Sequence, residues 1–319
     1  MDYLILIIGF ILLIKGADIF VDAAASIAKK FKIPSMIVGL TIVSLGTSAP
    51  ELAVSLIASI EGSNGITIGN VLGSNIFNTL MVLGITAIIM PIVIKKSIVF
   101  KDYIVNTMVT IILLILSCIS TLFNNETVLN RISGLILLIL AIAYTIYLVK
   151  EAKNQNQEEE NEGEKDFNIL SSIIKIVIGI IGIILGGNLV VNSASNIAGS
   201  FGLSDKLIGL TIVAMGTSLP ELVTSVIAAI KGENDIAIGN VLGSNIYNIL
   251  LILGISSVIN PIIFSSVLLL DIAFLIVISI ILGIFMFNSK NEKLSLNKLE
   301  GVILVLLYLG YISYIIFRN

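Results

Sequence analysis

The chain contains two copies of one stretch of sequence, at 38–91 and 208–261. A shift of 170 residues aligns them without a gap, with 34 identities in 54 positions. The segment GNVLGSNIFN at 69–78 returns as GNVLGSNIYN at 239–248. Any fold of this chain must therefore be built from two related halves, and the chemistry of the repeated residues must occur twice.

Both copies lie in apolar surroundings. The 319-residue chain is 57% hydrophobic and 12% charged, which is about half the charged fraction of a soluble protein. Apolar runs of about 20 residues, enough to span a bilayer, recur along the whole length. We therefore predict an all-α polytopic membrane protein with ten transmembrane helices, at 3–26, 35–60, 66–92, 99–120, 130–150, 168–195, 205–230, 236–262, 264–288 and 297–317.

The number of helices in each half determines how the halves are related. Residues 1–150 are predicted to form a first five-helix repeat and 168–319 a second. Because five is odd, the second repeat enters the membrane from the opposite side, so the repeats are inverted. Inverted repeats with interrupted helices at matching positions are typical of secondary transporters, whose substrate site lies near the middle of the membrane.

Residues 151–167 separate the two repeats. They carry seven acidic residues and two lysines, and we interpret them as a solvated linker. Thirteen lysines lie in predicted loops on the side of this linker, against three basic residues on the other side. By the positive-inside rule the linker is cytoplasmic and both termini are extracellular. The expected location is the cell membrane, as a multi-pass protein.

The segment GTSAPEL at 46–52, repeated as GTSLPEL at 216–222, places polar residues and a proline inside an apolar helix. The spacing i, i+3, i+4, i+7 puts four residues of the first copy on one helical face: Ser44, Thr47, Ser48 and Glu51. The second copy puts four on the equivalent face: Ala214, Thr217, Ser218 and Glu221. Proline has no amide hydrogen, so each kink frees backbone oxygens, which in hydrocarbon need a cavity or a partner.

The repeated GNVLGSN segments supply further oxygen donors. Two residues one turn apart in each half share a helical face, namely Ser74 with Asn78 and Ser244 with Asn248. Gly69 and Gly73 form a small-xxx-small pair that favours close approach of another helix. We interpret the neighbouring amides as hydrogen-bonding groups between helices: Asn70, Asn75, Asn240 and Asn245.

The repeated motifs lie on four predicted helices, 35–60, 66–92, 205–230 and 236–262, which we expect to form one core. The metal ligands that this core offers are all oxygen atoms, which hard cations prefer. Ca²⁺ takes about six to eight oxygens. Glu51 and Glu221, each binding through both oxygens, would supply four, and the carbonyls of Thr47 and Thr217 two more. The same oxygens, shared differently, would hold Na⁺, and mutually exclusive occupancy is the physical basis of exchange. Serine and threonine in membrane helices often bond only to the i−4 carbonyl, but two intramembrane glutamates at repeated positions favour a functional role.

Other intramembrane charges are not repeated. Asp18 and Asp22 in the first helix are matched by asparagines in the second half, so a charge is not required at both places. Lys15 lies one turn from Asp18 and is a candidate ion-pair partner for it. Asp271 has no partner that the sequence identifies and is assigned no role.

The paired motifs GTSAPEL with GNVLGSNIFN and GTSLPEL with GNVLGSNIYN resemble the alpha repeats of the cation/calcium exchanger superfamily, most closely its prokaryotic sodium/calcium exchangers. The resemblance covers essentially the whole chain. It implies a secondary active antiporter that exchanges Na⁺ for Ca²⁺ by alternating access. It also implies that helices 1 and 6 slide across a rigid, ion-binding core of helices 2, 3, 7 and 8.

The resemblance also implies a set of ion ligands. Ca²⁺ would be bound by the two motif glutamates with the motif threonine carbonyls, and Na⁺ by flanking sites that the serines and the carbonyls of Ser44 and Ala214 complete. Carried over to this chain, the side chains and carbonyls of the motifs belong to Thr47, Ser48, Glu51, Ser74, Asn78, Thr217, Ser218, Glu221, Ser244 and Asn248. One departure matters: some relatives, including potassium-dependent exchangers, have an aspartate where this chain has Asn248. Two carboxylates without a third argue against potassium dependence and leave the Na⁺ stoichiometry and the role of protonation open.

Three other functions are compared with Na⁺/Ca²⁺ exchange. An antiporter that couples Ca²⁺ or another divalent cation to H⁺ would use Glu51 and Glu221 as proton carriers, and a passive channel would show no counter-transport. An enzyme is disfavoured because the chain has no histidine and a single cysteine, Cys118, so the usual nucleophile–base pairs and zinc sites cannot form. The expected partners are Ca²⁺, Na⁺ (H⁺ in the alternative) and the lipid bilayer, with no cofactor, nucleic acid or obligatory protein partner.

Overall fold

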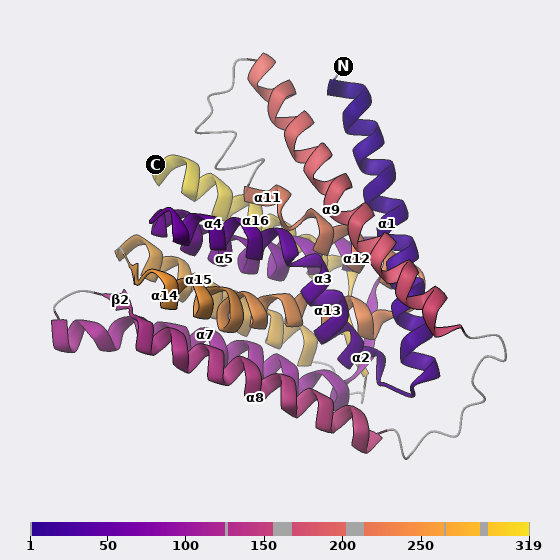
Figure 1. Cartoon of the computed structure of the whole chain (residues 1–319), viewed down its shortest axis with the longest axis horizontal. Coiled ribbons are helices and arrows are strands. Elements are labelled where there is room, and N and C mark those ends of the chain that lie inside the picture. The colour runs from indigo at the N-terminus through magenta and orange to yellow at the C-terminus, as the bar shows by residue number, and fades with distance from the viewer. Residues whose placement is uncertain are drawn as a thin grey trace.

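The structure is a computed structural model that describes residues 2–124, 127–155, 168–201, 214–264, 266–287 and 293–318. The chain is mostly helical (Figure 1). Among the described residues, eight helices are long and apolar enough to span a membrane, and nine if the bent pair Ser35–Thr47 and Ala49–Ile60 forms one span. These features identify a multi-pass integral membrane protein.

In the first half, the helices predicted at 35–60 and 66–92 are divided into several shorter helical elements, whereas the other three are continuous. The helical elements are α1 (Asp2–Lys30), α2 (Ser35–Val38), the π-helix η1 (Gly39–Val43), α3 (Ser44–Thr47), α4 (Ala49–Ile60), α5 (Asn64–Phe77), the π-helix η2 (Asn78–Val82), α6 (Leu83–Ile89), α7 (Lys96–Asn124) and α8 (Arg131–Gln155). Helix α8 therefore extends into the predicted linker, whose residues 156–167 lie outside the described part.

The second half repeats these breaks at a shift of 170 residues. Its helical elements are α9 (Ile169–Ser200), α11 (Ala214–Gly216), α12 (Leu219–Ile230), α13 (Asn234–Tyr247), the π-helix η4 (Asn248–Leu253), α14 (Gly254–Ile259), α15 (Ser266–Phe287) and α16 (Lys298–Arg318). The predicted helix 205–230 is described only in its second part, because residues 202–213 lie outside the described ranges. The ten-helix inverted repeat therefore remains a prediction.

Two predicted helix ends were wrong, for the same reason in each half. Helices were expected to run to 92 and 262, but α6 ends at Ile89 and α14 at Ile259. The residue before a proline is disfavoured in the helical region, and Met90 and Asn260, which precede Pro91 and Pro261, are extended. Short strands follow each break: β1 (Ile92–Lys95) pairs antiparallel with β4 (Lys293–Leu296), and β2 (Val128–Leu129) with β3 (Ile262–Ile263).

Helices α1 and α9 lie side by side along one flank of the molecule (Figure 1). They meet backbone to backbone through glycines. A Cβ atom added at Gly16 would lie 2.7 Å from the amide nitrogen of Ile183, and one at Gly186 would lie 2.4 Å from that of Leu13. Such spacing requires glycine and favours close packing of membrane helices, so α1 and α9 form one tightly joined pair.

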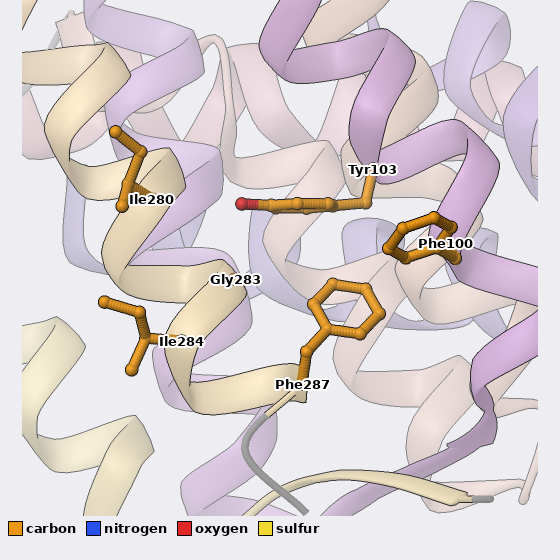
Figure 2. Close-up of a pocket in the computed structure, with 6 residues that line it drawn as sticks. All are labelled: Phe100, Tyr103, Ile280, Gly283, Ile284 and Phe287. Atoms are coloured by element: carbon orange, nitrogen blue, oxygen red, sulfur yellow. The ribbon is translucent and has the colours of Figure 1, made fainter.

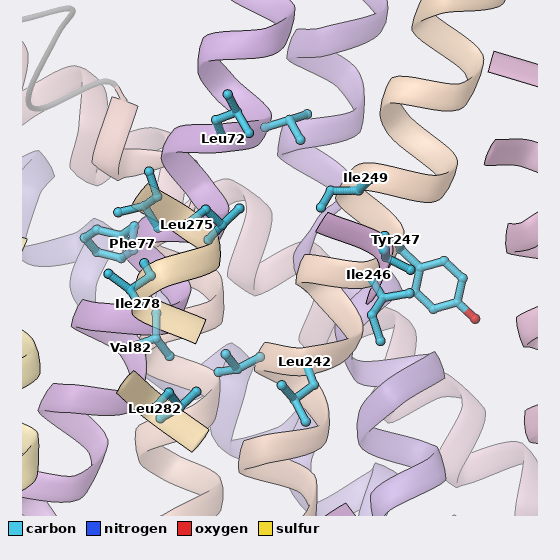
Figure 3. Close-up of a cluster of buried hydrophobic side chains, with 14 of the residues drawn as sticks. Leu72, Phe77, Val82, Leu242, Ile246, Tyr247, Ile249, Leu275, Ile278 and Leu282 are labelled. Carbon is cyan, nitrogen blue, oxygen red and sulfur yellow. The ribbon is translucent and has the colours of Figure 1, made fainter. Parts of the chain in front are cut away.

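The largest apolar core lies between α5, α13 and α15 (Figure 3). Side chains of the two repeat-related helices, such as Leu72 and Leu242, are fully or almost fully buried there. A separate open groove between α7 and α15 has an apolar lining apart from the hydroxyl of Tyr103, which donates to the carbonyl of Ser279 at 2.8 Å (Figure 2). With that hydroxyl already bonded, the groove has no oxygen ligands to match those of the core helices.

Candidate cation-binding site

The break between α3 and α4 turns the chain by 50° at Ser48. Pro50 stands in the first turn of α4, where its missing amide hydrogen is not needed. Ser48 precedes α4 but its hydroxyl does not cap that helix, and Ser218 has the same position before α12. The predicted four-residue face is thus divided between two helix segments, and both serine hydroxyls are available to other partners.

These two serines reach across to the carboxylate of the other half. Ser48 Oγ donates to Glu221 Oε1 at 2.8 Å, and Ser218 Oγ donates to Glu51 Oε1 at 2.9 Å. Both glutamates are fully buried. Hydrogen bonds to an ionised acceptor are among the stronger ones in proteins, so each half helps to hold the carboxylate of the other. The structure therefore brings Glu51 and Glu221 into one site.

A serine of α5 and a serine of α13 also contact the two glutamates. Ser74 Oγ lies 3.4 Å from Glu51 Oε1, and Ser244 Oγ lies 3.4 Å from Glu221 Oε1. Ser48 Oγ and Ser244 Oγ lie 2.9 Å from each other. The contacts of these four serines with the glutamates all fall on one oxygen of each carboxylate, Oε1.

Four buried oxygens of the predicted site residues have no hydrogen-bond partner among the described residues. They are the second carboxylate oxygens and two amide oxygens: Glu51 Oε2, Glu221 Oε2, Asn78 Oδ1 and Asn248 Oδ1. All four side chains are fully buried. Burying an unpaired polar oxygen costs roughly 1–3 kcal/mol and more when it is charged, so these oxygens favour a positive partner. In the described part of the chain no three acidic, histidine or cysteine residues gather to hold a metal, so the negative charge here comes from two carboxylates.

The asparagines predicted to form hydrogen bonds between helices do form them. Asn75 Nδ2 donates to the carbonyl of Asn245 at 3.0 Å, and Asn248 Nδ2 donates to Asn75 Oδ1 at 3.0 Å. Asn78 Nδ2 donates to Asn245 Oδ1 at 3.2 Å. These bonds join α5 to α13 and orient the two outer amides. Asn78 and Asn248 also begin the π-helices η2 and η4, and π-helical turns are frequent at functional sites.

Three residues predicted to bind an ion through their backbone carbonyls use their hydroxyls to bond to other protein groups. Ser44 Oγ donates to the carbonyl of Leu40 at 2.8 Å, which is the i−4 bond expected of a serine with a structural role. The hydroxyls of Thr47 and Thr217 are bonded to amides of the opposite half. For the two threonines the backbone carbonyl is the group left for an ion, whereas the carbonyl of Ser44 accepts from the amide of Ser48 at 2.9 Å and from Thr47 Oγ1 at 3.3 Å. Ala214 begins α11, next to residues 202–213, which are outside the described ranges.

The close approach predicted at Gly69 and Gly73 is seen at their counterparts in the second half, and the described residues leave it untested at Gly69 and Gly73. A Cβ at Gly239 or Gly243, their counterparts, would lie 2.7 Å and 2.6 Å from carbonyls of the first broken helix. At Gly69 and Gly73 themselves nothing within the described ranges lies within 4 Å. The counterpart of the contacting helix falls in 206–213, outside those ranges.

The ion pair proposed between Lys15 and Asp18 is not the one that forms. Lys231 Nζ lies 2.6 Å from Asp18 Oδ1 and 2.6 Å from Asp22 Oδ1, joining α1 to the end of α12. Burial opposes the charge of Lys231, but the two carboxylates outweigh it and hold the pKa of Lys231 above its usual value. Sequence spacing favoured Lys15 as the partner of Asp18, whereas the fold brings Lys231 from the other half of the chain to it. Asp271 is buried on α15.

The comparison with known proteins agrees with the geometry. The family model described as sodium/calcium exchanger protein matches residues 1–150 and 171–317. The chain is 32% identical, over an alignment of 353 residues, to the sodium/calcium exchanger MaX1 of Methanosarcina acetivorans, covering 98% of this chain and 97% of that protein. It is 35% identical over 265 residues to the inner membrane protein YrbG of Escherichia coli, covering 81% and 79%. A solved structure of the sodium-calcium exchanger NCX_Mj matches with a TM-score of 0.83 at 33% identity, covering 98% of each chain.

Proposed function

The chain belongs to the sodium/calcium exchanger family, and from this premise we propose that it exchanges Na⁺ for Ca²⁺ across the membrane by alternating access. Members of this family are transporters, not enzymes. The observation that carries the proposal is the set of four unpartnered, buried oxygens on Glu51, Glu221, Asn78 and Asn248. Two carboxylates neutralise one Ca²⁺, and the same oxygens redistributed suit Na⁺.

Each predicted residue then has a role. Glu51 and Glu221 bind Ca²⁺ through their carboxylates, with the carbonyls of Thr47 and Thr217 adding two oxygens. Ser48 and Ser218 hold the carboxylate of the opposite half, at 2.8 Å and 2.9 Å. The other members of the set lie around this centre and complete Na⁺ sites: Ser44, Ser74, Asn78, Ala214, Ser244 and Asn248.

The movement follows from how the helices are joined. The pair α1 and α9 is tightly packed to itself through glycines, and we propose that it slides as one unit across the core that carries the site. Ten helices in two inverted repeats would present the site first to one side and then to the other. The acidic linker 151–167 would lie in the cytoplasm, with both termini outside the cell and the protein in the cell membrane.

The coupling ion is tested with purified protein in liposomes. We expect an outward Na⁺ gradient to drive ⁴⁵Ca²⁺ uptake when the pH is clamped equal on both sides, because Na⁺ and Ca²⁺ compete for one set of oxygens. Uptake that follows a pH gradient and ignores Na⁺ would instead identify the H⁺-coupled antiporter. Ca²⁺ flux without any counter-transport would identify a channel.

Replacement of Asn248 by aspartate tests whether this amide faces the ion. The unpartnered Asn248 Oδ1 would become an oxygen of a third carboxylate, and we expect the apparent Ca²⁺ affinity in exchange assays to rise by about tenfold, or ~1.4 kcal/mol. Asn78→Asp, the repeat-related variant, should act in the same direction. An unchanged Ca²⁺ and Na⁺ dependence in both variants would remove the amides from the ion's surroundings.

A further inference from the structure

Asn70 and Asn240 occupy repeat-related positions one turn before the serines of the site, and each makes three hydrogen bonds. Asn240 Nδ2 donates to the carbonyl of Glu221 at 3.3 Å and to Ser225 Oγ at 2.9 Å. Asn240 Oδ1 accepts from Thr47 Oγ1 at 3.0 Å. The amide therefore ties the glutamate of its own half to the broken helix of the other half.

Asn70 makes the same three bonds with the halves exchanged. Asn70 Nδ2 donates to the carbonyl of Glu51 at 3.2 Å and to Ser55 Oγ at 3.0 Å. Asn70 Oδ1 accepts from Thr217 Oγ1 at 3.4 Å. Neither Asn70 nor Asn240 has an unpartnered side-chain atom. This distinguishes them from Asn78 and Asn248, which each keep an oxygen unpartnered in the same site.

From these contacts we infer that Asn70 and Asn240 are positioning residues, which hold the threonine carbonyls of one half in register with the glutamate of the other. The inference rests on the proposed function and adds to it two residues that bind no ion. An asparagine amide suits this role because it donates and accepts at once. The donated bonds fix the glutamate backbone, and the accepted bond fixes the threonine whose carbonyl is offered to the ion.

Aspartate substitution separates positioning from ion binding. Asn240→Asp keeps the shape of the side chain but cannot donate, so the carbonyl of Glu221 loses its partner, while the hydroxyl of Ser225 can turn to donate to the new carboxylate. We expect the apparent Ca²⁺ affinity in ⁴⁵Ca²⁺ exchange to fall on the order of tenfold, the loss that removal of one to two hydrogen bonds produces. A ligand would respond in the opposite direction, because an added carboxylate strengthens Ca²⁺ binding. Tighter Ca²⁺ binding in Asn240→Asp would overturn the inference.

A double-mutant cycle tests the crossed pairing directly. Thr47→Val removes the hydroxyl at nearly constant volume, and Asn240→Leu removes the amide. Because these two residues share a hydrogen bond, their effects on apparent Ca²⁺ affinity should be non-additive, the double variant losing little more than the worse single one. The matched control combines Thr47→Val with Asn70→Leu, which share no hydrogen bond, and should be additive. Thr47→Ser keeps the hydroxyl and should restore most of the affinity.

The same cycle is also measured without ions, as the melting temperature of the purified protein in detergent. The bond between Thr47 and Asn240 joins two protein side chains, so its coupling should appear there whether or not the protein exchanges Na⁺ for Ca²⁺. If the wild-type protein shows no Na⁺/Ca²⁺ exchange but the melting temperatures of the variants are non-additive, the proposed function is rejected and the pairing of Thr47 with Asn240 stands. Additivity in both cycles, by affinity and by melting temperature, would reject the pairing itself. If Asn240→Leu does not fold, the mirror cycle of Thr217→Val with Asn70→Leu gives the same decision.

Discussion

Glu51→Gln and Glu221→Gln are each expected to reduce Na⁺-driven Ca²⁺ exchange by roughly 100-fold or more, the consequence of removing one charge from a buried site at about 3 kcal/mol. Glutamine keeps the shape of the side chain and can still accept from Ser218 or Ser48. It removes the charge that a divalent ion needs in a site with only two carboxylates. Because each carboxylate is held by the opposite half, both variants should fail to a similar degree.

The control for this prediction lies on the same helix. Glu61 stands at the exposed end of α4, and Glu61→Gln should retain exchange. Transport is measured as ⁴⁵Ca²⁺ uptake in liposomes, and folding as the elution profile and melting temperature of the purified variants. Full exchange by either Glu51→Gln or Glu221→Gln, with normal folding, would show that the glutamate is a scaffold residue and would end the proposed mechanism.

Gly186→Ala is expected to destabilise the protein by about 1–3 kcal/mol, the range for overpacking a tight contact. The new Cβ would lie 2.4 Å from the amide nitrogen of Leu13 and 2.8 Å from the carbonyl oxygen of Gly9. Both are backbone atoms, which cannot turn aside as a flexible side chain can. Helices α1 and α9 would have to separate, and the movement of the pair as a unit would suffer with the stability.

The adjacent glycine provides a matched control. A Cβ at Gly187 would lie 3.7 Å from Pro220 Cγ, which is ordinary contact. Both substitutions gain the same helix propensity, since alanine is favoured over glycine by about 1 kcal/mol in a helix. Gly187→Ala should therefore melt at or above the wild-type temperature, and Gly186→Ala below it. Equal melting temperatures for the two variants would refute the close contact between α1 and α9.

Much of the fold and of the site is predictable from local features of the sequence. Apolar length gives the spans, and the repeat gives the pairing of Glu51 with Glu221. Proline at 91 and 261 also carries the signal for the two misplaced helix ends, because the residue before a proline avoids the helix. What the sequence could not supply are contacts between residues far apart in the chain, such as Lys231 with Asp18.

The roles of individual hydroxyls and amides were hardest to predict. Thr47, Ser48 and Asn240 are all repeated and all polar, and spacing alone does not tell which of them faces a cation. Their roles differ because of the partner that each finds in the opposite half. The hydroxyl of Thr47 donates to the amide of Asn240, whereas the hydroxyl of Ser48 donates to the carboxylate of Glu221. Asn70 and Asn240 lie at the same position in the two copies, one turn before Ser74 and Ser244. This was the signal in the sequence that these amides do more than join two helices.

The ion pairs of Lys231 exist at one end of the molecule only. The counterparts of Asp18, Asp22 and Lys231 in the other half are Asn188, Asn192 and Glu61. When two inverted repeats exchange conformations, contacts present in both are lost on one face and regained on the other, so their free energies cancel over the change. A contact without a mirror image does not cancel. Under the proposed alternating access, the inward- and outward-facing forms would therefore differ in free energy even with identical solutions on both sides, and Lys231 would contribute to that difference.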